Sequence, residues 1–152
     1  MATTRDTFLT FGELLEELAG NSRQALSALE HRERGDAGRG GGDRYSALVD
    51  WVCERQRHIL EGLEGLAERG SPGLLERYLQ YRPELGAGPS VADRESVFNW
   101  TLDANNLALE VLSDLQHKTL APEAEATIAD LVRQLEAINR KIAMAMNTAG
   151  DV

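Results

Sequence analysis

Apolar residues recur at steps of three and four along four segments of the chain, which is the spacing of one face of an amphipathic helix. No segment shows sustained alternation of apolar and polar residues, so the sequence predicts no β-sheet. Glycine and proline separate the segments. The predicted long helices cover residues 6–31, 43–69, 91–118 and 122–147, with a short helix at 74–81 between the second and the third.

These segments predict an all-α fold, namely a single antiparallel four-helix bundle over residues 1–152. Helices of this length are each roughly 37 Å long at 1.5 Å per residue. Short links join the first helix to the second and the third to the fourth, which favours antiparallel neighbours. Segment 35–43 has five glycines and is expected to form a flexible loop that tolerates small deletions.

A few polar residues lie on the apolar faces of the predicted helices, and these are the candidates for functional groups in the interior of the bundle. At 100° per residue, four neutral residues face inward, one from each long helix. A buried amide without a partner costs about 1–3 kcal/mol. We therefore expect Gln56 and Asn139 to be buried and hydrogen-bonded, to each other or to a neighbour. The four residues are Ser22, Gln56, Thr101 and Asn139.

Residues that could ligate a metal or act as nucleophiles fall outside the apolar faces. Glu54 and His58 have i, i+4 spacing and Asp114 and His117 have i, i+3 spacing, but both pairs are interpreted as solvated. The only cysteine, Cys53, excludes an intramolecular disulfide and a thiol-rich metal site. A neighbouring carboxylate raises a thiol pKa, so a reactive thiolate is not expected there. These patterns predict no catalytic centre.

The net charge of the chain argues against some classes of binding partner. The chain has 16 Lys and Arg against 25 Asp and Glu, a formal net charge of −9. This excess of negative charge repels phosphate, so we expect neither nucleic acid nor an anionic membrane surface as a partner. No stretch approaches the ~18 consecutive apolar residues of a membrane span. The first ten residues lack the apolar run of a signal peptide, which predicts a cytoplasmic location.

The four-helix pattern and two sequence segments resemble a group of small bacterial ferritin-like (rubrerythrin-like) bundle proteins. In that group the second helix carries an Asp-Tyr-Leu-x-x-His-Glu run, and a short helix ending in Gln-Tyr follows it. Here residues 50–63 read Asp-Trp-Val-Cys-Glu-Arg-Gln-Arg-His-Ile-Leu-Glu-Gly-Leu, and residues 79–81 read Leu-Gln-Tyr. The resemblance implies a ferritin-like fold.

The metal ligands of the family are not matched. Ferritin-like di-iron bundles use an inward Glu from each of two helices and Glu-x-x-His from each of the other two. Here Arg55-Gln56 replaces His-Glu, and Glu136-Ala-Ile-Asn139 is the nearest match to Glu-x-x-His. Amide side chains bring no negative charge and bind iron far more weakly. The resemblance therefore implies a bundle that lacks the di-metal centre.

Two functions remain open. The first is a non-catalytic bundle without a cofactor, which acts by self-association or by binding a protein partner. The second is a ferritin-like metal-dependent oxidase or iron-handling protein. Its iron would be held by Glu30, His58 and Glu136 after a rotation of the helices.

The apolar surface of the third helix favours the first function. Phe98, Leu102 and Leu109 lie about 200° around this helix from the edge formed by Trp100 and Leu107. One core needs an apolar arc of about 100° or somewhat more. The excess predicts a homodimer interface at Phe98, Leu102 and Leu109. In the alternative, the short helix at 74–81 covers the excess within the chain.

Overall fold

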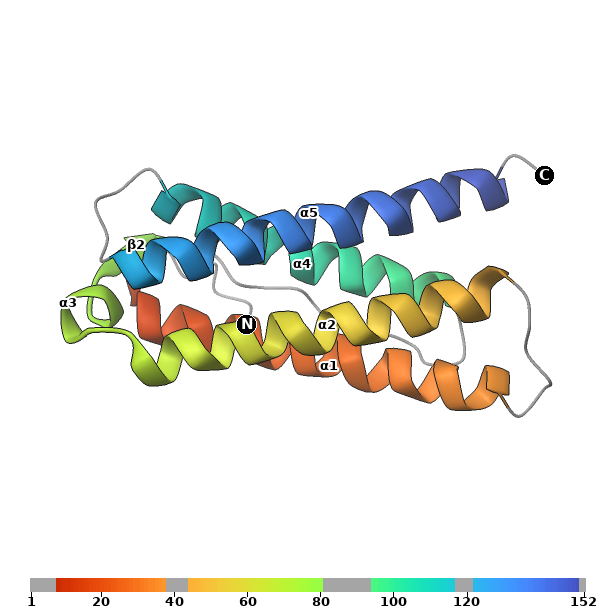
Figure 1. Cartoon of the computed structure of the whole chain (residues 1–152), viewed down its shortest axis with the longest axis horizontal. Coiled ribbons are helices and arrows are strands. Elements are labelled where there is room, and N and C mark those ends of the chain that lie inside the picture. Colours follow the sequence, from red (N-terminus) through yellow and green to blue (C-terminus); the bar gives the residue numbers. More distant parts are fainter. Residues whose placement is uncertain (1–7, 38–43, 81–93, 117–121, 151–152) are drawn as a thin grey trace, which may run out of the picture.

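The computed structural model describes residues 8–37, 44–80, 94–116 and 122–150 (Figure 1). Four long helices dominate these segments, which confirms the predicted all-α bundle. Their order along the chain is β1 (Phe8–Thr10), α1 (Phe11–Ala37), α2 (Arg44–Arg69), α3 (Pro72–Leu75), β2 (Tyr78–Gln80), α4 (Arg94–Gln116) and α5 (Pro122–Gly150).

The long helices form two antiparallel hairpins, α1 with α2 and α4 with α5. Helix α1 also packs against α4, and α2 packs against α5, so each helix has two neighbours around one core. Helices α2 and α4 run in the same direction, because α2 ends beside α3 and α4 begins at the opposite end of the bundle (Figure 1). A bundle with one long connection between its hairpins results.

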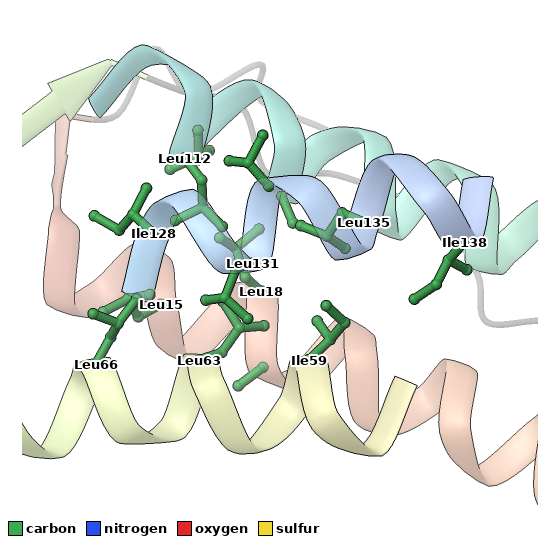
Figure 2. Packing of buried hydrophobic residues seen from close by; sticks show 14 of the residues in the cluster. Leu15, Leu18, Ile59, Leu63, Leu66, Leu112, Ile128, Leu131, Leu135 and Ile138 are labelled. Carbon is green, nitrogen blue, oxygen red and sulfur yellow. The ribbon is translucent and has the colours of Figure 1, made fainter. Parts of the chain in front are cut away.

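Leucine, isoleucine and valine fill the space between the four helices. Figure 2 shows these side chains meeting from α1, α2, α4 and α5. The largest fully buried side chains come from every long helix, and they follow the predicted apolar faces closely. Among them are Leu15, Leu18, Ile59, Leu63, Leu112, Leu131 and Leu135. None of the helices in the described segments is apolar enough over its length to cross a bilayer.

A capping box sets the start of α1 five residues later than predicted. The Thr10 backbone N donates to Glu13 Oε1 at 3.0 Å, and the Glu13 backbone N donates to Thr10 Oγ1 at 3.1 Å. This reciprocal pair satisfies two amide groups that have no partner in the helix. The Thr10 backbone hydrogen bond also lowers the pKa of the Glu13 carboxyl. At its other end α1 continues to Ala37, so residues 35–37 of the predicted loop are helical, and residues 38–43 lie outside the described residues.

The predicted short helix between the second and the third long helix is present, but it spans Pro72–Leu75 rather than 74–81, and the prediction of no β-sheet is wrong. Ser71 caps α3 by accepting from the Leu74 backbone N at 3.3 Å, but α3 lasts only four residues. The chain then extends into β2, which pairs antiparallel with β1 in the register Leu9↔Leu79. Three-residue strands are too short to show alternation, and their partners lie about 70 residues apart, so the sequence pattern carries no signal of this pairing.

Candidate functional site

Three buried polar residues from three helices meet in the interior, and we call them the polar centre: Ser22 of α1, Gln56 of α2 and Asn105 of α4. Gln56 is 0% exposed. Its Nε2 donates to Ser22 Oγ at 2.9 Å and to Asn105 Oδ1 at 3.0 Å. Asn105 Nδ2 donates back to Gln56 Oε1 at 3.1 Å. The two amides therefore form a reciprocal pair, with the serine hydroxyl on the second amide proton of Gln56.

This arrangement satisfies the polar centre from within. Both amide carbonyl oxygens accept a hydrogen bond, and both Gln56 amide protons are donated. All three side chains are neutral at physiological pH, so they provide neither a general acid or base nor an anionic metal ligand. The chemistry of the polar centre is that of a structural hydrogen-bond network that aligns three helices.

Sequence reasoning missed Asn105. The sequence analysis placed only Thr101 on the inner face of the third helix, although Asn105 lies only 40° from Thr101 around the helix axis. The spacing of four residues between Thr101 and Asn105 was the available signal. Because α4 packs between α1 and α5, its buried arc is wide enough to include both residues.

The other two inward polar residues do not join the polar centre. Thr101 is fully buried and donates from Oγ1 to the Val97 carbonyl oxygen of its own helix at 2.8 Å. Asn139 is only partly buried and donates from Nδ2 to Oδ1 of the exposed Asn106 at 2.8 Å. The expectation that Asn139 is interior is wrong, because Ile138 takes the inward position and Asn139 lies 100° further around α5.

The residues suggested as iron ligands do not converge. Glu30 Oε2 on α1 accepts from Arg57 Nη2 at 3.3 Å, His58 faces outward on α2, and Glu136 is exposed on α5. Within the described part of the chain, no group of three or more His, Cys, Asp and Glu residues could hold a metal ion. His117, from the second sequence pair, lies outside the described residues.

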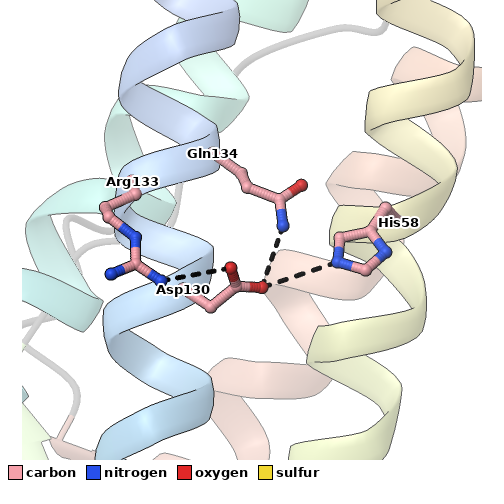
Figure 3. A network of polar contacts seen from close by, with 4 residues as sticks. All are labelled: His58, Asp130, Arg133 and Gln134. Carbon is pink, nitrogen blue, oxygen red and sulfur yellow. Dashed lines mark hydrogen bonds and ion pairs between the residues drawn. The ribbon is translucent and has the colours of Figure 1, made fainter.

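His58 belongs instead to a surface network between α2 and α5 (Figure 3). Its Nε2 lies 3.5 Å from Asp130 Oδ2, to which Gln134 Nε2 donates at 2.8 Å. Arg133 Nη2 lies 3.4 Å from Asp130 Oδ1. These four residues include an acid and a base but no hydroxyl or thiol, so they do not form a nucleophilic triad. Since His58 and Asp130 are about half exposed, the network adds little stability.

The single cysteine is buried and unreactive. Cys53 is 0% exposed within the core cluster. Burial, with a further contribution from the Glu33 carboxylate, raises the pKa of the Cys53 thiol to about 12. The thiol therefore stays protonated at neutral pH, and the nucleophilic thiolate is essentially absent.

The row of apolar residues predicted as an interface is largely covered by the chain itself. Phe98 is 2% exposed and belongs to the core, so its assignment to an exposed interface is wrong. Leu102 and Leu109 are partly buried and pack against the same core. The physical reason is that α4 contacts two helices, so its core-facing arc is wider than a single seam requires. Among the described residues, the exposed large apolar side chains are Tyr78 and Met144.

Comparisons with protein-family models, with curated proteins and with solved structures give no match for this chain.

Proposed function

We propose that this protein is a non-catalytic helical bundle that acts by association through its outer surface, first of all with a second copy of itself. The main support for this proposal is the polar centre, which offers no group for catalysis. Its three side chains are neutral, and its two amides pair with each other. The charged side chains that could do chemistry lie outside the core and pair across helices, as His58 and Asp130 do.

The strip formed by Leu102 and Leu109 on α4 is the surface that we assign to self-association. The two residues are seven positions apart, so they lie within about 20° of each other around the helix. Each is only partly buried against the core. Closing this strip against a second copy removes the remaining apolar surface from water. The net charge of −9 opposes the contact, but salt screens that repulsion beyond about 8 Å.

Sedimentation velocity at tens of micromolar protein tests the proposal. We expect a dimer for the unmodified chain and a folded monomer for the double variant Leu102→Gln/Leu109→Gln. Met144→Gln is the matched control, because it removes an exposed apolar side chain elsewhere and should leave the dimer intact. Circular dichroism verifies that each variant keeps its helices. An unmodified chain that sediments as a monomer contradicts self-association.

Iron handling is the second candidate function, and the topology favours it. Two hairpins joined by one long connection are the arrangement of ferritin-like bundles. The ligands weigh against it, because Glu30, His58 and Glu136 do not converge. Metal analysis of protein purified without chelator separates the two functions. Roughly one to two irons per chain, as in a di-iron bundle, would replace the first proposal by the second.

We propose further that the protein is cytoplasmic and that it binds neither nucleic acid nor an anionic membrane surface. The charge balance supports the expectation that nucleic acid and anionic membrane surfaces are not partners. A cytoplasmic location is part of the same proposal, and fractionation of cells that express the chain tests it.

A further inference from the structure

A cleft of about 380 Å³ opens at the end of the bundle where α2, α3 and α5 meet. This volume lies within the range of small-molecule sites, which extends from about 300 to 1,000 Å³. Its walls are glycines and apolar side chains with a few polar groups. Among the residues that line it are Gly65, Leu66, Arg69, Leu74 and Ala124.

Glycine creates part of the space. A Cβ atom added at Gly65 would lie 2.8 Å from Arg69 Nη2, so the guanidinium lies back across the position where a side chain is missing. Gly65 is inside helix α2, where glycine is less favourable than alanine. Its backbone does not adopt a positive φ that would require glycine. The benefit of glycine at this position is the room that it leaves for Arg69.

Among the described residues that line the cleft, Arg69 is the only one with a charged side chain. Within the described segments, no hydrogen bond or ion pair engages its guanidinium. Leu66, Leu74 and Ala124 provide the apolar walls beside it. An unpaired guanidinium at an apolar recess selects an anion, and its planar fork matches a carboxylate in particular.

We propose that this cleft binds a small monocarboxylate with a short apolar tail. The carboxylate pairs with Arg69, and the tail lies against Leu66, Leu74 and Ala124. The Ser71 hydroxyl also lines the cleft, but it already accepts from the Leu74 backbone N. This site is separate from the proposed self-association surface, which lies on α4. Evidence against one of the two proposals leaves the other unaffected.

Isothermal titration with hexanoate as the probe tests the site, with hexan-1-ol and acetate as the tail-only and charge-only comparisons. We expect hexanoate to bind more tightly than either. Arg69→Gln should weaken hexanoate binding at least tenfold, since it removes a charge-assisted pair. Arg133→Gln, at an exposed arginine on α5 outside the cleft, should leave binding unchanged.

Two glycine variants separate a binding effect from a folding effect. Gly65→Ala should raise the melting temperature, because alanine favours the helix, and yet weaken hexanoate binding, because its Cβ displaces the guanidinium. Gly20→Ala is the matched control, since a Cβ there meets no atom within 4 Å. It should raise the melting temperature without changing affinity. Absence of hexanoate binding, equal binding of hexan-1-ol, or full affinity in Arg69→Gln would each overturn the proposal.

Discussion

The two halves of α2 contact the rest of the bundle in opposite ways. In the first half, side chains reach across to neighbouring helices. Gln56 bonds to α1 and α4, and the ring of Trp51 lies 4.3 Å from Lys141 Nζ of α5. In the second half, glycines, which have no side chain, determine how closely other groups approach the helix. A Cβ at Gly62 would lie only 2.5 Å from Leu131 Cδ2, so glycine permits the close approach of α5.

The spacing of apolar residues does not distinguish these two kinds of contact. Both halves of α2 show the same three-and-four spacing of apolar residues. The contacts of the first half depend on polar side chains, whereas those of the second half depend on glycines. A change in the first half should leave groups unpaired, whereas a change in the second half should cause overpacking.

Replacing Gln56 by methionine should cost about 3 kcal/mol of unfolding free energy. The variant keeps the size of the side chain but leaves the Asn105 amide buried without its partner and frees the Ser22 hydroxyl. Urea denaturation followed by circular dichroism measures the loss. Gln134→Met is the control, because Gln134 is only partly buried and donates to the half-exposed Asp130, and it should cost well under 1 kcal/mol.

Gly62→Ala should destabilise the protein by about 1–2 kcal/mol, although alanine favours a helix. The new Cβ forces Leu131 out of its present position in the core. Gly20→Ala should instead stabilise the protein by about 0.5–1 kcal/mol, because its Cβ meets open space. Thermal melting of the two variants shows opposite signs if packing at Leu131 is as tight as described. A stabilising Gly62→Ala would refute the close approach.

Lys141→Gln should cost about 0.5–1 kcal/mol by removing the cation over the Trp51 ring. Arg140→Gln, an exposed cation one position earlier on α5, should change stability by less than that. The difference between the two variants in urea midpoint reports the cation–π contribution. Equal midpoints would mean that the contact adds nothing in solution.

The stability of the protein should also depend weakly on pH through the Glu33 carboxyl. A hydrogen bond to Asp50, together with burial, raises the pKa of Glu33 above its ordinary value of 4.5. The folded chain therefore holds this proton more tightly than the unfolded chain does, so stability falls as pH rises from about 4.5 through the raised pKa. Glu33→Gln should lack this decline and be relatively more stable near neutral pH. Parallel pH profiles for both proteins would contradict this assignment.

The sequence was sufficient for the architecture because the apolar faces of four long segments fix helix identity and orientation. It identified Ser22, Gln56 and Thr101 on the inner face, and these side chains lie in the interior. It also placed Asn139 on the inner face of α5, where the neighbouring Ile138 lies instead. An error of one residue rotates a side chain by 100° around a helix.

Features that depend on how closely helices approach could not be predicted from periodicity. Phe98 is covered because α4 has two neighbouring helices, and the partnership of Asn105 with Gln56 depends on the depth of both helices in the core. The pairing of β1 with β2 joins short segments far apart in sequence. The cleft beside Arg69 depends on glycines, which leave space because they have no side chain. The spacing of apolar residues carries no information about such space.

The structural role proposed for the polar centre requires that Ser22, Gln56 and Asn105 satisfy one another's hydrogen bonds. A double-mutant cycle on Gln56→Met and Asn105→Leu tests this most directly. Each single variant should be strongly destabilised, and the loss in the double variant should be smaller than the sum of the two single losses by a coupling energy of about 1–3 kcal/mol. Strictly additive losses, with no coupling between the two residues, would contradict it.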